Sequence, residues 1–140
     1  MKQCKFYVEG IQGKQRPRAS MIGGHAHIYT PSKTKDFEKR VAAAFREAGG
    51  EMIEKGIPVR ISIVIFHKIP AGTSKKKRAE MLDHTTVPMK APDVDNICKL
   101  VMDAGNGVFY QDDKQVVGLV AYKYWADEDG MQITVSDITR

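Results

Sequence analysis

Cysteine is scarce in this chain, and long apolar runs are absent. The only cysteines among its 140 residues are Cys4 and Cys98, which are too few and too widely separated for a disulfide framework or a thiolate metal site. No stretch approaches the roughly 20 apolar residues of a membrane span, and residues 1–5 lack the apolar core of a secretion signal. We therefore expect a soluble, cytoplasmic protein with reduced thiols and no membrane partner.

Internal repeats and low-complexity blocks are also lacking. The length of the chain and its 42% content of hydrophobic residues suffice for one ordinary core and not for two. The expected organisation is a single domain over residues 1–140.

Basic residues outnumber acidic ones, and the two signs are separated along the chain. Lys and Arg total 22 against 17 for Asp and Glu, which gives a formal net charge of +5. A polyanion such as nucleic acid is the natural partner of such a chain. The acids gather at residues 93–113, whereas basic residues gather at 14–18, 33–40 and 75–78. An acidic pocket rimmed by phosphate-binding side chains is the pattern that a nuclease needs.

The acidic segment predicts a divalent-metal site. Two unit charges about 5 Å apart repel by roughly 3 kcal/mol at an effective dielectric constant near 20, so a cation is expected among them. Mg²⁺, with Mn²⁺ as the alternative ion, prefers carboxylate oxygen, and such an ion promotes hydrolysis of phosphodiesters. The segment contains five candidate ligands, namely Asp93, Asp95, Asp103, Asp112 and Asp113.

A helix beginning near Asp95 would bring part of this set together. Asp95, Lys99 and Asp103 follow one another at four-residue steps and would share one helix face, with Asp95 as the expected N-cap. The opposite face is apolar at helical spacing and should dock on the core, through Ile97, Leu100, Val101 and Ala104. Asn106-Gly107 should end the helix.

Residues 108–110 are expected to form a short strand after that helix. The strand would carry Asp112 and Asp113 back toward the start of the helix and close the site.

Simpler interpretations remain open for each feature. Paired aspartates before a helix often act only as caps and as partners of the helix dipole. Lys99 would equally serve as a solvated partner of Asp95 and Asp103. The basic residues 75–78 are also typical of a solvated loop or helix start.

The remaining pattern indicates an α+β protein with a mixed β-sheet and helices packed mainly on one side. Residues 59–66 should form the centre of the sheet, because Val64 and Phe66 make its second face apolar too. The other expected elements are strands at 6–10, 26–30, 115–124 and 131–135, a helix from Ser32 or Thr34 to about residue 48, and a basic helix at 74–82.

The aspartate segment is part of a longer ordered motif. It runs Pro-Asp-Val-Asp-Asn at residues 92–96, then Lys99, Asp103 and Asn106-Gly107, and ends with Asp-Asp-Lys-Gln at 112–115. This order resembles the RusA family of Holliday-junction resolvases. The likeness extends to residues 13–18, 29–31 and 74–78, so it covers most of the chain. One departure is Pro92, where some relatives carry a basic residue that contacts DNA.

The resemblance implies a RusA-like homodimer and a crossover junction endodeoxyribonuclease. Such an enzyme uses Mg²⁺ to place paired, symmetric nicks in a four-way DNA junction during recombination and repair, often in a phage or prophage. By position, Asp93, Asp95 and Asp113 match the essential metal-binding carboxylates, and Lys99 matches the essential lysine. Further candidates for the site are Asp103, Asp112, Asn96 and Gln115.

DNA contacts are expected from the two basic segments, that is, from Lys14, Arg16, Arg18, Lys75, Lys76, Lys77 and Arg78. Two rival functions stay open beside junction resolution. One is a non-catalytic protein that binds branched DNA, which would be expected to have lost at least one residue of the acid set. The other is a metal-dependent nuclease with the same chemistry that acts on other branched DNA or on RNA.

Overall fold

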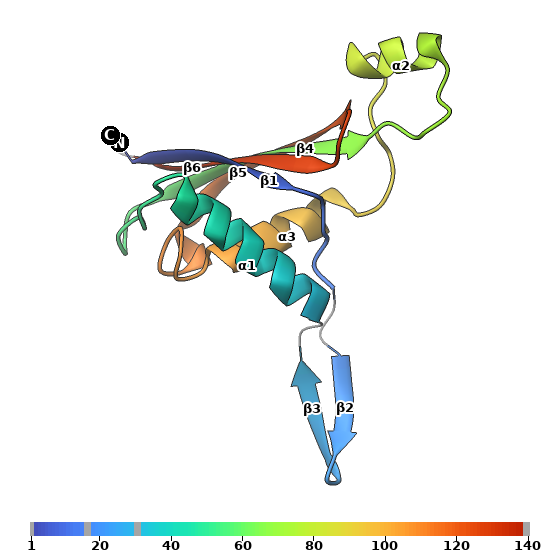
Figure 1. The fold of residues 1–140 in the computed structure, drawn as a ribbon. Helices are drawn as coiled ribbons and strands as arrows, with labels where there is room; N and C mark the ends of the chain where they lie inside the picture. The colour runs from blue at the N-terminus through green and yellow to red at the C-terminus, as the bar shows by residue number, and fades with distance from the viewer. Residues whose placement is uncertain (1, 16–17, 30–31, 139–140) are drawn as a thin grey trace.

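The chain folds around a mixed sheet of four strands (Figure 1). The computed structural model describes residues 2–15, 18–29 and 32–138, with the backbone alone for 18–20, 22 and 27–29. The strands follow the order β1-β6-β4-β5, and their bounds are Gln3–Glu9 (β1), Gly130–Asp137 (β6), Val59–Lys68 (β4) and Val116–Ala126 (β5). Strand β6 is antiparallel to both of its neighbours, whereas β4 and β5 run parallel. The predicted inner position of residues 59–66 is confirmed.

Two helices cover one face of this sheet. Helix α1 (Ser32–Glu47) and helix α3 (Val94–Gly105) lie on the same side in Figure 1. The alternation along β4 explains the choice of face, because one set of side chains is fully buried and the other only half-buried: Ile61, Ile63 and Ile65 against Ser62, Val64 and Phe66. The α+β architecture predicted from the sequence, with helices mainly on one side, is confirmed.

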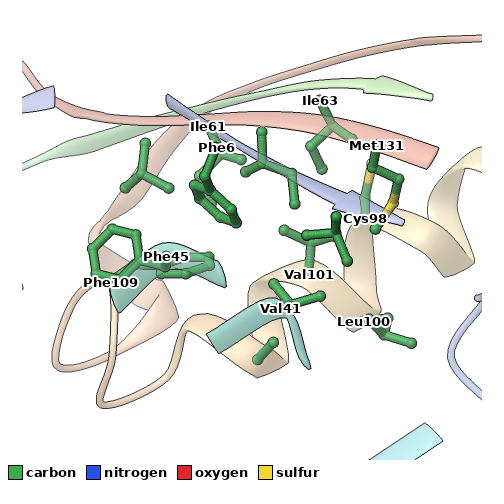
Figure 2. Packing of buried hydrophobic residues seen from close by; sticks show 14 of the residues in the cluster. Phe6, Val41, Phe45, Ile61, Ile63, Cys98, Leu100, Val101, Phe109 and Met131 are labelled. Carbon is green, nitrogen blue, oxygen red and sulfur yellow. The ribbon is translucent and has the colours of Figure 1, made fainter. Parts of the chain in front are cut away.

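The core lies between this sheet face and the two helices (Figure 2). Phe6 of β1 meets the rings of Phe45 and Phe109 edge-on, with ring centroids 5.7 Å apart in both pairs. Helix α3 adds Leu100 and Val101, which are fully buried. Burying a large apolar side chain stabilises a fold by about 1.5–3 kcal/mol, so the apolar face of α3 is firmly anchored and its polar face is held in place.

Helix α3 begins earlier than predicted. Asp93, and not Asp95, occupies the N-cap position, with the extended dihedral angles φ −67° and ψ 150°. The Asp93 carbonyl accepts the first helical bond, from the N–H of Ile97 at 3.1 Å. This start places Asp95 in the first turn, where its negative charge is favourable against the helix dipole.

The predicted strand at residues 108–110 is wrong, because this segment is a tight turn. The N–H groups of Val108 and Phe109 bond back to the carbonyl of Gly105 at 2.9 and 2.8 Å. A side chain at Gly105 would collide with the Phe109 ring, so the turn depends on that glycine. Tyr110 forms isolated bridges with Ile53 and with Asn106, and not a strand. A single 3₁₀ turn, η1 (Asp113–Gln115), follows.

Helix α2 (Lys75–Leu82) and a two-stranded hairpin lie outside the main layers. The basic helix predicted at 74–82 is confirmed as α2, and the structure shows Ser74 as its N-cap. Strand β3 (His25–Tyr29) matches the prediction at 26–30, whereas its hairpin partner β2 (Arg18–Ile22) was not predicted. Figure 1 shows this hairpin extending away from the sheet. No helix within the described ranges is both long and apolar enough to cross a membrane.

Candidate functional site

The polar face of α3 lines a cleft of about 700 Å³. Asp95, Lys99 and Asp103 face this cleft from the helix, and Asp113 faces it from η1. The remaining lining is mostly apolar and comes from α3 and β5: Val94, Cys98, Met102, Leu119 and Ala121. The structure therefore brings together residues from two segments that the sequence analysis singled out as one site.

The carboxylates at the start of α3 are exposed and have no internal partners. The side chain of Asp93 does not cap the helix. Within the described ranges, the side chain of Asp95 forms neither a hydrogen bond nor an ion pair, and the same holds for the ammonium group of Lys99. The interpretation of Lys99 as an ion-pair partner of its helix neighbours is therefore not realised. Asp95 and Lys99 are available to a ligand that enters the cleft, whereas Asp93, directly before the first helical residue, is not among the residues that line it.

Asp113 reaches the cleft because a neighbouring loop holds its backbone. The Asp113 N–H donates to Oδ1 of Asn106 at 3.0 Å. Asn106 is the C-cap residue of α3, so one side chain ties the end of the helix to the acid that faces it. From the sequence, Asn106 was expected only to end the helix, and its contact with Asp113 was not predicted. The one signal in the sequence for this contact was that an amide side chain stands shortly before Asp112 and Asp113.

Asp112 and Gln115 build the turn that carries Asp113. Oδ1 of Asp112 accepts from the N–H of Lys114 at 2.8 Å, and Oε1 of Gln115 accepts from the N–H of Asp112 at 3.2 Å, so the two side chains form a capping box. The Gln115 amide also donates to the carbonyls of Glu54 and Ile57 at 2.8 and 3.1 Å. Both residues were predicted as members of the site, and the structure shows them supporting it.

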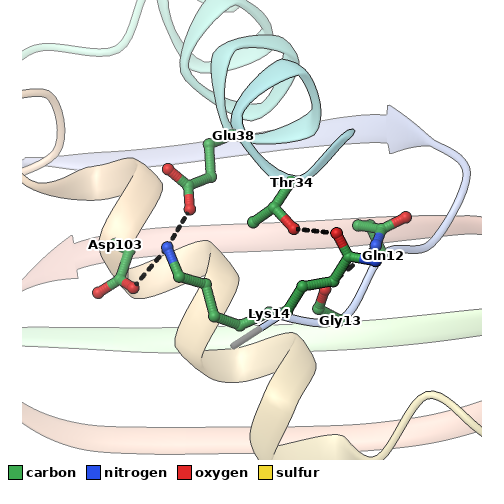
Figure 3. Close-up of polar contacts among 7 residues, drawn as sticks. Gln12, Gly13, Lys14, Thr34, Glu38 and Asp103 are labelled. Carbon is green, nitrogen blue, oxygen red and sulfur yellow. Dashed lines mark hydrogen bonds and ion pairs between the residues drawn. The ribbon is translucent and has the colours of Figure 1, made fainter. Parts of the chain in front are cut away.

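Asp103 lies at the other end of the cleft and is held by a cation of the chain itself (Figure 3). The Lys14 ammonium contacts Oδ2 of Asp103 at 3.1 Å and Oε1 of Glu38 at 2.6 Å, and thereby joins α3 to α1. Burial disfavours the charge of Lys14, but the hydrogen bonds and charges of its two partners outweigh burial and raise its pKa. Lys14 was predicted to bind DNA, and here its charge is engaged within the fold.

The segment around Lys14 packs closely on the start of α3. The Lys14 N–H donates to the carbonyl of Asn96 at 2.9 Å. A Cβ atom at Gly13 would lie only 2.9 Å from Cβ of Pro92 and 3.4 Å from Cβ of Asn96, so this approach needs a glycine. Asn96, another predicted member of the site, thus contributes its backbone to the packing.

The pKa values of two neighbouring groups reflect the negative charge of the acids. Burial, and then the charge of Asp95, raise the pKa of the Cys98 thiol. Burial also raises the pKa of Tyr110, and the charges of Asp113, Asp103 and Asp112 add to that effect. The Tyr110 hydroxyl donates to the carbonyl of Met102 at 2.7 Å. A cation entering the cleft would be stabilised by this negative charge.

The donor chemistry of the cleft fits a hard divalent cation. Its charged lining offers the carboxylate oxygens of Asp95, Asp103 and Asp113, which Mg²⁺ and Mn²⁺ prefer, and the carboxylate of Asp95 is free of internal partners. No group of three His, Cys, Asp or Glu side chains is placed to hold one ion jointly in the part of the chain that the structure describes. The acids are therefore gathered on one cleft without forming a closed metal cage.

The other predicted DNA-binding residues lie apart from the cleft. Lys75, Lys76 and Lys77 are exposed on α2, which Figure 1 shows beyond the end of β4, across the sheet from α1 and α3. Arg78 pairs with Asp127. Arg18 begins β2, and Arg16 lies outside the described residues.

Sequence reasoning missed Lys123. Its ammonium donates to the carbonyls of Lys90 and Pro92 at 2.6 and 2.7 Å, directly before Asp93. Burial lowers the pKa of Lys123, against the opposing attraction of Asp93, and the charge of Lys90 lowers it further. The signal was a lysine on the helix-facing side of an otherwise apolar strand, where alternation places it together with Leu119 and Ala121.

Comparison with known proteins places this cleft within a shared region. Residues 10–136 match the profile of a protein family described as Endodeoxyribonuclease RusA. The chain is 34% identical over 138 residues to the protein YqaN of Bacillus subtilis strain 168, with 96% of each chain covered. It is 24% identical over 126 residues to the crossover junction endodeoxyribonuclease RusA of Lactococcus phage r1t, with 89% of this chain and 88% of the phage protein covered.

Proposed function

Because the chain belongs to the RusA family of endodeoxyribonucleases, we propose that it resolves four-way (Holliday) DNA junctions by paired, symmetric nicks, using Mg²⁺, in recombination and repair. The observation that carries the proposal is the meeting of Asp95, Lys99 and Asp113 on one cleft. Support also comes from the phage relative, which is named as a crossover junction endodeoxyribonuclease. A phage or prophage origin and a cytoplasmic location fit this role.

The carboxylates divide the work of the reaction with Lys99. Asp93, Asp95 and Asp113 would hold the ion, with Mn²⁺ as the alternative to Mg²⁺. When bound, the ion acidifies a water molecule and offsets the charge of the phosphate. Lys99, on the same helix face as Asp95, offsets the negative charge that develops on the phosphate in the transition state. Asn106 keeps Asp113 facing the helix through its backbone N–H.

The basic segments would hold the DNA around this cleft. The three exposed lysines of α2 are suited to phosphate contacts, which position a nucleic acid without reading its sequence. Arg16, Arg18 and Arg78 are proposed to contribute as well. Lys14 contributes less, because its ammonium group already has two carboxylate partners.

A homodimer completes the proposal. A four-way junction has near two-fold symmetry and two strands to cut, and a C₂ pair of identical subunits matches that symmetry. Each subunit would then supply one cleft and place one of the two nicks.

Cleavage of an end-labelled synthetic junction tests the proposal, beside linear duplex, flap, single-stranded DNA and RNA, with Mg²⁺ or EDTA. We expect paired nicks confined to the junction, lost in EDTA and in Asp95→Asn. Asp36→Asn makes the same chemical change at an exposed position of α1 and should cut normally.

Three other outcomes of this experiment would change the proposal in different ways. Tight junction binding without cutting would favour a non-catalytic branched-DNA-binding protein. Cutting of the control substrates would keep the chemistry and overturn the substrate. Full activity of Asp95→Asn would contradict the assignment of the cleft.

A further inference from the structure

The backbone that leads into Asp93 is held from the side of β5 by one ammonium group. Nζ of Lys123 donates to the carbonyl of Lys90 at 2.6 Å and to the carbonyl of Pro92 at 2.7 Å. These two short bonds span the three residues immediately before Asp93. Hydrogen bonds from a charged donor are shorter and roughly twice as strong as neutral ones, so Lys123 is a strong local constraint.

Asp93 has few other constraints. Its side chain makes no capping bond and its backbone is extended, so the direction of its carboxylate depends on the chain on either side of it. On the C-terminal side, α3 fixes that chain. On the N-terminal side, Pro92 is packed against Gly13 and bonded to Lys123, and these contacts hold it from two directions.

A purely packing role does not account for a lysine at this position. Lys123 lies on the face of β5 that carries Leu119 and Ala121 into the cleft, where an apolar side chain would avoid the cost of burying a charge. Within the described ranges, Lys123 has no carboxylate within ion-pairing distance. Its two hydrogen bonds both go to the backbone of residues 90–92, which lead into Asp93. The charged group of Lys123 therefore holds this segment in place.

We propose that Lys123 is a positioning residue for Asp93. Its bonds to the carbonyls of Lys90 and Pro92 fix the backbone of residues 90–92 and thereby aim the Asp93 carboxylate toward a divalent cation bound at the neighbouring cleft. The inference rests on the proposed function, since it takes Asp93 to be one of the ion's ligands. It assigns a charged role to the edge strand β5, which otherwise contributes apolar side chains to the cleft.

Binding of Mn²⁺ to the free protein, followed by electron paramagnetic resonance, tests the proposal without DNA. Removing an outer partner of a metal ligand typically lowers metal affinity by about 10–100-fold, and we expect Lys123→Met to weaken Mn²⁺ binding by about 10-fold. Lys123→Arg, which keeps a charged donor, should recover much of the loss. Lys5→Met, at an exposed lysine of β1, is the matched control and should bind Mn²⁺ like the wild type.

A double-mutant cycle with Asp93→Asn separates positioning from general damage. If Lys123 acts through Asp93, Lys123→Met should cause no further loss of Mn²⁺ affinity once Asp93 is replaced. Additive losses, or wild-type affinity in Lys123→Met, would overturn the proposal. If Lys123→Met does not fold, Lys123→Leu, which also lacks a donor group, takes its place in the cycle under the same criteria.

Junction cleavage then distinguishes this inference from the function on which it rests. In Lys123→Met, the Mg²⁺ concentration for half-maximal cleavage should rise while the KM for junction DNA stays unchanged. If the wild-type protein cuts no junction but the Mn²⁺ cycle is non-additive, the proposed substrate fails and the positioning role stands. If the wild type cuts junctions and the cycle is additive, only the positioning role fails.

Discussion

The two ends of the polar face of α3 carry the same kind of side chain in opposite circumstances. At the N-terminal end, Asp93 and Asp95 are exposed and free of internal partners. At the C-terminal end, Asp103 is tied to Lys14, which also holds Glu38 of α1. A carboxylate whose charge is balanced within the fold stabilises the fold, whereas one left unbalanced on a cleft is available for a ligand. On this single helix, the paired acid therefore supports the fold, whereas the unpaired acids are available for chemistry.

Neutralising an acid in each circumstance should have the largest and clearest effect. We expect Asp95→Asn to lower junction cleavage on the order of 100-fold or more, because even outer partners of a metal site cost about 10–100-fold. Asp103→Asn should stay within a few-fold of the wild type. Single-turnover cleavage at saturating protein measures both. Equal losses in the two variants would erase the distinction between the two ends of α3.

The paired end should instead respond in stability. Lys14→Met leaves Asp103 and Glu38 close together without their cation, and we expect the free energy of unfolding to fall by about 2 kcal/mol, which is less than the 3–5 kcal/mol of a fully buried pair. Urea denaturation gives the value. Asp95→Asn, which leaves no charge unpaired, should unfold at nearly the wild-type urea concentration. A loss in Asp95→Asn that matches the loss in Lys14→Met would count against this division.

A smaller effect is expected for a residue that positions a proposed ligand of the ion without binding the ion itself. Asn106→Ala removes the acceptor for the Asp113 N–H, and we expect cleavage to fall by about 10-fold, at the low end of the range for such partners. Asn106→Asp keeps an acceptor oxygen and should lose less than Asn106→Ala if hydrogen bonding is what matters. Measuring the Mg²⁺ dependence of both variants shows whether the ion site is the part that is disturbed.

The smallest effect concerns the basic surface. Replacing Lys75, Lys76 and Lys77 with Gln should weaken junction binding and reduce the salt slope by about 0.9 for each phosphate that the protein no longer neutralises. Lys14→Met should leave that slope nearly unchanged, because its charge is already paired. Fluorescence anisotropy over a series of salt concentrations measures the slope. An unchanged slope in the triple variant would return α2 to the role of a solvated helix.

Local patterns made much of the fold predictable. The apolar stripe of α3 and the alternation of Ile61, Ile63 and Ile65 are periodic signals over one element, and both elements formed where expected. The start of α3 was misplaced because two aspartates stand within one turn and either can cap. Residues 108–110 are β-branched or aromatic, which favours a strand, but the contact of Gly105 with Phe109 turns the chain instead.

The contacts that support the site between separate elements could not be predicted from the sequence. The motif predicted that Asp95, Lys99 and Asp103 share one helix face, because spacing along a helix decides which side chains lie together, and all three line one cleft. The Lys14 bridge, the Lys123 bonds and the Asn106 contact all join separate elements or loops, and no local pattern encodes such pairings. The hairpin turn at Gly23–Gly24, with φ of 57° and 80°, was not predicted either, because residues 18–22 show no clear alternation.

The most direct test of the account is a Mn²⁺ titration of the free protein, comparing wild type with Asp95→Asn and Asp103→Asn by electron paramagnetic resonance. We predict that Asp95→Asn weakens Mn²⁺ binding by about 10-fold or more, whereas Asp103→Asn binds nearly as the wild type does. Equal affinity in all three proteins would contradict the central claim that the unpaired acids of α3 form the ion site of this nuclease.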